Sequence, residues 1–370
     1  MLSGMVDIQR VGQYFFQATR VRQVWESTRD DVGFLGQVRR GLLPLPTDRS
    51  APYVDPFPPL RRHRHDAWAD RRVAVIATGG SGALASMVGV VRALQEADVH
   101  PVAYGVSSGS ALFGIPLAAG MAADDVAQAT LALQPRDYLD PDWRALLEAP
   151  LRLGRGWSGI VKGERLEAAF REILGDVTLA ELPMPVWFPL WNIERNRLEY
   201  IGPDSHPDLP AARAVRMAVA LPLAVQPNPL DGGWWLDGGI VDILPAGPFV
   251  GTDRCDTAVV VNCFYPPGFV GDEASGWEQR PLSILHVADQ TKTMAHLQLA
   301  RRSMADLRQS VGDVVVLEPV PYAKVRGAGL YGQFLDSREW PTFMAEGYQV
   351  MAATLASRSA GSPPGSRSRR

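Results

Sequence analysis

Two adjacent serines are flanked by glycines, and a serine flanked in this way is a candidate nucleophile. The pattern G-x-S-x-G fits one register only, residues 105–109 (GVSSG), which places Ser107 at its centre. In this pattern the small flanking residues let a strand turn sharply into a helix, with the serine on a strained turn. The free amides and the dipole of the helix N-terminus then favour developing negative charge. The segment therefore predicts either a nucleophilic Ser107 or a plain glycine- and serine-rich turn.

A second glycine-rich turn, residues 78–85 (TGGSGALA), precedes the serine motif. Part of it matches G-x-G-x-x-A, the fingerprint of dinucleotide sites, which also needs an acidic residue at the end of the second strand. That strand ends at residues 104–106, and the nearest acid, Asp98, comes before it. We therefore expect no dinucleotide cofactor. The other functional reading is an oxyanion hole made of backbone amides, and a simple tight turn is the third.

A third segment, residues 234–249 (WWLDGGIVDILPAGPF), contains an aspartate followed by two glycines. Asp237 follows a short apolar stretch, and the two glycines allow another backbone to approach it closely. A D-G-G sequence by itself is most often just a turn.

The elements around these motifs predict how they are positioned. An apolar strand, a tight glycine turn and a helix occur twice within residues 72–120, which is typical of a doubly wound parallel sheet. Because the two turns end neighbouring parallel strands, we expect them to share one crevice. Further along we expect a hairpin over 185–202 with its turn at Arg195–Asn196, strands at 257–264 and 311–320, and helices at 279–309 and 340–356.

Composition excludes several classes of protein. The net charge of the 370 residues is only −3, so no basic field indicates a nucleic acid partner. Cys255 and Cys263 are too few for a disulfide framework, and no signal peptide is visible, so a cytoplasmic location is expected. The uncharged stretches 73–91 and 101–123 are interrupted by glycine and serine, which favours a buried core over membrane spans.

The chain divides into four predicted segments. Residues 1–43 form an N-terminal amphipathic helical extension, 44–71 a proline- and arginine-rich linker, 72–358 the catalytic domain and 359–370 a disordered tail. His63 and His65 in the linker lack a third ligand nearby, so no metal site is predicted. The segment 134–160 is either a lid or a set of surface helices.

The order of the three motifs resembles the patatin-like phospholipase family. Residues 214–227 are similar to the helix and proline turn that precede the family's aspartate, Pro245 matches a proline after it, and residues 334–356 are similar to the C-terminal helix. The resemblance covers about 72–358. It implies an α/β fold of three layers, with a mostly parallel sheet and helices on both faces. It also implies a lipid acyl hydrolase that needs no metal or other cofactor.

The family's site residues carry over by position. The resemblance implies Ser107 as nucleophile and Asp237 as its base, without a catalytic histidine. It also implies an oxyanion loop and a set of supporting glycines: Gly79, Gly80, Ser81 and Gly82 for the loop, and Gly105, Gly109, Gly238 and Gly239 for the support. Burial beside Trp234, Trp235 and Leu236 would raise the pKa of Asp237 and strengthen it as a base.

Two departures from the family pattern affect the expected substrate. Ser81 stands where the family has its third glycine, and Ala83 stands where it has an arginine or lysine. Backbone amides survive both changes, but a candidate phosphate contact is lost. We therefore expect neutral lipid esters and lysophospholipids to be as suitable as phospholipids, with the enzyme peripheral to a membrane surface.

Two alternatives remain open. One is an α/β-hydrolase with a Ser–Asp–His triad, because His286 and His296 both follow Asp237 in the chain. Both histidines lie in apolar helical surroundings, where a core histidine is more usual. The other is a catalytically inactive lipid-binding protein of the same fold, although such a protein has no need of both Ser107 and Asp237.

Overall fold

The centre of the fold is a mixed eight-stranded sheet. The computed structural model describes residues 54–68, 70–142, 148, 158–270, 284–325 and 337–360. The strand order is β10-β9-β1-β2-β4-β8-β7, with β5 paired to β4. Its strands are β1 (Val73–Ala77), β2 (Ala103–Gly105), β4 (Val186–Asn192), β5 (Arg197–Ile201), β7 (Asn228–Leu230), β8 (Gly233–Asp237), β9 (Thr257–Val261) and β10 (Asp313–Leu317). Strands β10, β9, β1, β2 and β4 run parallel, whereas β5, β8 and β7 extend the sheet with antiparallel pairs.

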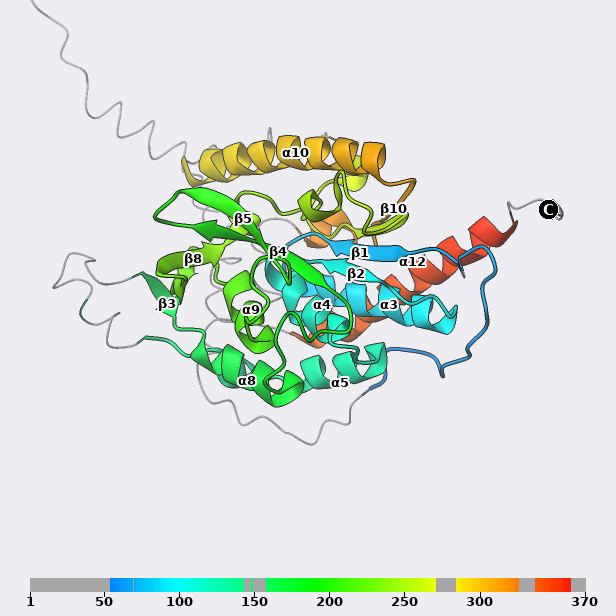
Figure 1. Ribbon diagram of the computed structural model, residues 1–370, viewed down its shortest axis with the longest axis horizontal. Helices are drawn as coiled ribbons and strands as arrows, with labels where there is room; N and C mark the ends of the chain where they lie inside the picture. Colours follow the sequence, from blue (N-terminus) through cyan, green and yellow to red (C-terminus); the bar gives the residue numbers. More distant parts are fainter. Residues whose placement is uncertain are drawn as a thin grey trace, which may run out of the picture.

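Helices cover both faces of this sheet (Figure 1). The long helix α10 lies on one face, and α3, α4, α9 and α12 lie on the other, with α5 and α8 further out. The helices are α3 (Ser86–Glu96), α4 (Ala111–Ala118), α5 (Ala123–Ala132), α6 (Pro135–Tyr138), α8 (Glu164–Leu174), α9 (Ala211–Ala218), α10 (Ile284–Ser310) and α12 (Trp340–Ala360). The predicted three-layer α/β architecture is confirmed.

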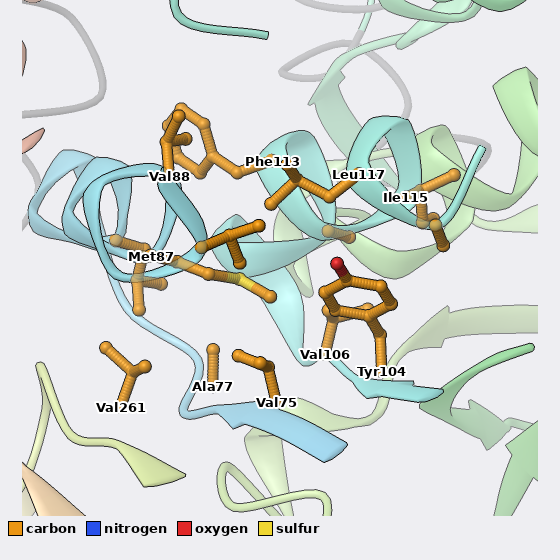
Figure 2. Packing of buried hydrophobic residues seen from close by; sticks show 14 of the residues in the cluster. Val75, Ala77, Met87, Val88, Tyr104, Val106, Phe113, Ile115, Leu117 and Val261 are labelled. Carbon is orange, nitrogen blue, oxygen red and sulfur yellow. The ribbon is translucent and has the colours of Figure 1, made fainter. Parts of the chain in front are cut away.

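Strand β1 is apolar throughout because each of its faces is covered. Val73, Val75 and Ala77 pack with the helices on one side, where Figure 2 shows Met87 of α3 above the strand. Ala74 and Ile76 belong to the second cluster, on the side of α10. All five residues of β1 are buried. A parallel strand buried on both faces reads as a continuous hydrophobic run, which is why the sequence predicts it so clearly.

The hairpin of β4 and β5, strands β9 and β10, and helices α10 and α12 lie where the sequence predicts them. A small parallel sheet of β3 (Gly159–Val161) and β6 (Leu223–Val225) was not predicted, nor was β7, whose Pro229 is tolerated because β7 is an edge strand. No helix in the described part of the chain is long and apolar enough to cross a membrane.

The proline- and arginine-rich segment before β1 packs against the domain. Phe57 and Trp68 are buried in the core, and the backbone amide of His63 donates to the carbonyl of Glu96 at the end of α3 (2.8 Å). The predicted N-terminal extension and the tail beyond residue 360 lie outside the described residues. The domain boundaries therefore stay a prediction.

Candidate active site

The register of β4 brings the predicted serine and aspartate to the same place. The last residue of β2, Gly105, pairs with Trp187, whereas Asp237 at the end of β8 pairs with Leu190 further along β4. Because β8 is antiparallel to β4, the chain after Asp237 runs back alongside β4 towards the end of β2. The two turns that carry Ser107 and the D-G-G sequence therefore meet.

Ser107 lies on the sharp turn between β2 and α4, and its side chain is fully buried. Its own backbone is extended (φ −142°, ψ 135°), and the left-handed residue is its neighbour Ser108 (φ 51°). The expectation of strained angles at the central serine is corrected here, because the strain lies one residue later. Ser110, which the sequence analysis did not single out, fixes the turn. Its hydroxyl accepts from the amide of Ser107 (2.8 Å) and donates to the carbonyl of Ser107 (2.8 Å).

Gly239 lies between the two predicted reacting side chains. A Cβ on this glycine would be 2.9 Å from Oγ of Ser107 and 3.0 Å from Oδ1 of Asp237. Oδ1 of Asp237 accepts from the Gly239 amide (2.7 Å), and the whole aspartate is 1% exposed. Ser107 Oγ also donates to the backbone carbonyl of Asp242 (3.4 Å). The structure thus places a buried hydroxyl and a buried carboxyl around one glycine.

The glycine loop after β1 borders the same serine. A Cβ on Gly79 would be 3.2 Å from Oγ of Ser107, so the two glycine-rich turns lie next to each other, as expected. However, the Gly79 amide donates to the carbonyl of Ile243 (2.8 Å) and is already engaged. The oxyanion role of Gly80, Ser81 and Gly82 stays a prediction. Gly80 has a left-handed backbone (φ 148°), which favours glycine at that position.

Two of the supporting glycines permit close backbone contacts. A Cβ on Gly105 would be 2.8 Å from Cε2 of Phe249 and 3.1 Å from the carbonyl oxygen of Pro245. A Cβ on Gly238 would be 2.6 Å from the carbonyl carbon of Pro189 on β4. Gly109 is buried in the helical turn that follows Ser107. A side chain at Gly105 would therefore press on Phe249 and on the Pro245 carbonyl, and one at Gly238 would push the end of β8 away from β4.

Asp242 and Tyr200 form a polar pair next to Ser107 that the sequence analysis missed. The hydroxyl of Tyr200, on β5, donates a short hydrogen bond to Oδ2 of Asp242. Burial raises the pKa of Asp242 to about 6, and the hydrogen bond from Tyr200 acts in the opposite direction. The sequence carries no signal for this pair, because it depends on the register of the β4–β5 hairpin.

His296 lies near the D-G-G turn. It is 4% exposed on α10, and its Nε2 makes a short hydrogen bond with the backbone carbonyl of Ile240. The side chain of His286 and most of the predicted lid, residues 143–147 and 149–157, lie outside the described residues. Within the described part of the chain, no group of three or more His, Cys, Asp or Glu side chains could hold a metal ion.

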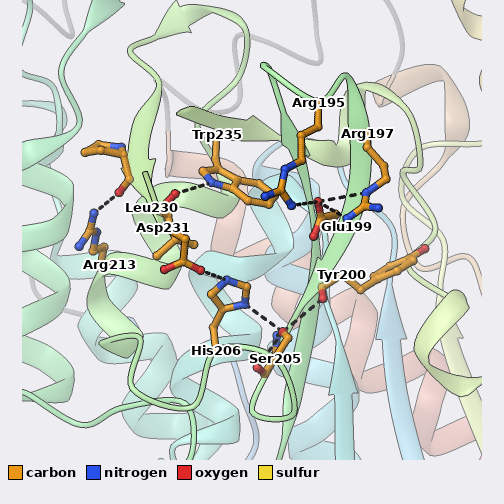
Figure 3. A network of polar contacts seen from close by, with 12 residues as sticks. Arg195, Arg197, Glu199, Tyr200, Ser205, His206, Arg213, Leu230, Asp231 and Trp235 are labelled. Carbon is orange, nitrogen blue, oxygen red and sulfur yellow. Dashed lines mark hydrogen bonds and ion pairs between the residues drawn. The ribbon is translucent and has the colours of Figure 1, made fainter. Parts of the chain in front are cut away.

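Another serine, histidine and aspartate are hydrogen bonded in a row (Figure 3). His206 Nδ1 lies 3.0 Å from Oγ of Ser205, and its Nε2 lies 3.0 Å from Oδ2 of Asp231. Ser205 is held in its own turn, because its Oγ accepts from the Gly202 amide (3.2 Å). The row joins that turn to the tip of the β7–β8 hairpin, which is a structural role.

A family model and several curated proteins match part of this chain. The model of patatin-like phospholipases matches residues 75–250. Uncharacterized NTE family proteins of Mycobacterium bovis and Mycobacterium tuberculosis are each 29% identical over 189 residues, covering 51% of this chain and 48% of theirs. This chain thus spans about half the length of the curated relatives it matches.

Solved structures similar to this chain include two proteins at low identity. VipD from Legionella pneumophila is 15% identical over 80% of this chain and 70% of that chain, with a TM-score of 0.43. Human GIVD cytosolic phospholipase A2, solved in complex with methyl gamma-linolenyl fluorophosphonate, is 10% identical over 92% of this chain and 63% of that chain, with a TM-score of 0.45.

Proposed function

We propose that the protein is a lipid acyl hydrolase that uses Ser107 and Asp237 as a catalytic pair, a proposal that proceeds from the match of residues 75–250 to the model of patatin-like phospholipases. The observation that carries this proposal is the position of Gly239, where one added carbon would be within 3.0 Å of both Ser107 Oγ and Asp237 Oδ1. The family match supports lipid esters as the substrate class.

The proposed reaction has two halves. Oγ of Ser107 attacks the ester carbonyl carbon while Asp237 takes the hydroxyl proton, and amides of the glycine loop stabilise the negative oxygen. The tetrahedral intermediate collapses, the alcohol leaves with the proton from Asp237, and the acyl group remains on Ser107. A water molecule then attacks the acyl-serine while Asp237 accepts its proton. The second tetrahedral intermediate collapses, the bond between the acyl carbon and Oγ breaks, and Asp237 returns the proton to Oγ of Ser107 as the fatty acid leaves.

Ester hydrolysis with matched serine variants tests this function. We expect the wild-type protein to hydrolyse p-nitrophenyl esters of apolar acyl chains, and Ser107→Ala to lose about 10³-fold or more in rate, the scale of losing a nucleophile. Ser108→Ala is the matched control, because it removes the neighbouring hydroxyl and keeps Ser107. Equal activity of Ser107→Ala and wild type would contradict the proposal.

The substrate preference follows from Ala83. This residue occupies the position of the family's basic residue, and its side chain is fully buried in the turn after the glycine loop. Without a cation there, we expect initial rates on a phospholipid and on a monoacylglycerol of the same acyl chain to differ by less than about tenfold. A phospholipid preference of about a hundredfold, roughly 2.7 kcal/mol, would show that another group binds the phosphate.

The histidine alternative predicts a different result for His296. Because its side chain contacts the carbonyl of Ile240, we expect His296→Ala to lose about tenfold or less per folded molecule, the scale of one hydrogen bond. His286→Ala is expected to retain most activity as well. A folded variant of either histidine that loses about 10³-fold or more would favour a Ser–Asp–His triad instead.

A further inference from the structure

We propose that Asp242, held by Tyr200, is a positioning residue for Ser107, and that its charge state controls how fast Ser107 reacts. The proposal rests on the acyl hydrolase function proposed above and adds to it a second carboxyl group. Asp242 acts through the backbone turn that it anchors, and not by contact with the substrate.

The backbone of this turn touches the nucleophile directly. Ser107 Oγ donates to the carbonyl of Asp242 (3.4 Å), and the amide of Asp242 donates in turn to the carbonyl of Gly238 (3.0 Å). The same turn contains Gly239, which separates Ser107 from Asp237. A shift of this turn would therefore move the serine hydroxyl relative to its proposed base.

The side chain of Asp242 fixes the turn to β5. Its carboxylate accepts the short hydrogen bond from Tyr200, whose ring lies against Gly247, where a Cβ would be 2.6 Å from Cε2 of the ring. The backbone of Tyr200 is held as well, because its carbonyl accepts from Oγ of Ser205 (3.5 Å; Figure 3). Tyr200 is thus held within the sheet, and it fixes the turn through one hydrogen bond to the carboxylate of Asp242.

The titratable groups around Asp242 come from several elements. Tyr200 faces it from β5. Burial raises the pKa of Tyr265, and the charge of Asp242 raises it further, so Tyr265 is also a neighbour of Asp242. Asp237 begins the same turn, and His296 of α10 binds the Ile240 carbonyl within it. Burial raises the pKa of Asp242 itself to about 6, against the effects of Tyr200 and the Leu244 amide.

The direction of the pH effect follows from the hydrogen bond. A hydroxyl donates more strongly to an ionised carboxylate than to a neutral acid. Above about pH 6 the ionised Asp242 is therefore held tightly by Tyr200, and below it the turn is held less tightly. The rate of reaction at Ser107 should then fall as the pH decreases through this range.

The test is the pH dependence of the rate at which a fluorophosphonate covalently modifies Ser107, measured on the full chain. The labelling rate of the wild-type protein should fall on the acid side of about pH 6, and this fall is the acid limb of the pH profile. Tyr200→Phe should move that limb upwards by about one pH unit, because it removes a hydrogen bond that stabilises the ionised form. Asp242→Asn should react at every pH at the slow rate that the wild type shows below the limb, and should lack the limb itself.

Tyr265→Phe is the matched control. It also removes a buried hydroxyl in this region, one that donates to the carbonyl of His296 (3.3 Å), and it should leave the limb in place. If the acid limb stays in place in both Tyr200→Phe and Asp242→Asn, the titrating group is Asp237 and the proposal is overturned. The proposal is also overturned if Tyr265→Phe moves the limb as far as Tyr200→Phe does. Absence of labelling at Ser107 in the wild type at every pH would overturn the hydrolase function, and this proposal with it.

Discussion

Asp237→Asn is expected to stay folded and to lose ester hydrolysis by about 10³-fold or more, the scale of losing a member of a catalytic triad. Asparagine has nearly the same shape, and its side-chain oxygen can still accept from the Gly239 amide, as Oδ1 of the aspartate does (2.7 Å). It cannot take a proton from Ser107. The loss should therefore appear in kcat, while circular dichroism and the melting temperature stay close to those of the wild type.

Asp231→Asn provides the matched control for this variant. Asp231 lies in the turn of the same β7–β8 hairpin, and its side chain is 70% exposed. Its left-handed backbone (φ 50°) is one that asparagine tolerates well, so the fold should be kept. We expect this control to retain wild-type activity. If Asp237→Asn kept a tenth of the wild-type kcat or more, another group would have to be the base.

Gly239→Ala is expected to lower activity by about a hundredfold or more without unfolding the domain. The new methyl group would be 2.9 Å from Oγ of Ser107 and 3.0 Å from Oδ1 of Asp237, closer than such atoms normally approach. The two side chains must therefore move apart, and a displacement of about 1 Å in a catalytic site can cost a factor of about 10². The φ of Gly239 is not left-handed, so alanine can adopt its backbone conformation.

Gly312→Ala serves as the control for an added methyl group. The nearest atom to its Cβ would be the carbonyl oxygen of Asp256 at 3.4 Å, an ordinary contact, and its φ is also not left-handed. Initial rates and melting temperatures of both variants decide the point. Full activity of a folded Gly239→Ala would mean that Ser107 and Asp237 need not meet across this glycine.

The parts of the fold that the sequence predicts are those with a local signal. Strand β1 is a continuous apolar run because both its faces are buried. The glycine turns come directly after β1 and β2 in the sequence, so they could be predicted together with these two parallel strands. The proximity of Gly79 and Ser107 could be predicted too, because neighbouring parallel strands end at the same edge of the sheet.

The parts that could not be predicted depend on register and on backbone detail. Only the antiparallel pairing of Asp237 with Leu190 brings the aspartate to the serine, and a strand pattern carries no register between distant segments. The left-handed angle at Ser108 and the engaged amide of Gly79 depend on how the turns pack. The bond between Tyr200 and Asp242 likewise joins elements far apart in the chain.

The most direct test of the proposed catalytic pair is mass spectrometry after reaction with a fluorophosphonate, which forms a covalent adduct with an activated serine. We expect one adduct in the wild-type protein, on the peptide that contains residues 103–113, with fragmentation placing it on Ser107. Ser108→Ala should be labelled in the same way, whereas Ser107→Ala should remain unlabelled and Asp237→Asn should react far more slowly. An adduct on any other residue, or equal labelling of the wild type and Ser107→Ala, would contradict the assignment of Ser107 as the nucleophile.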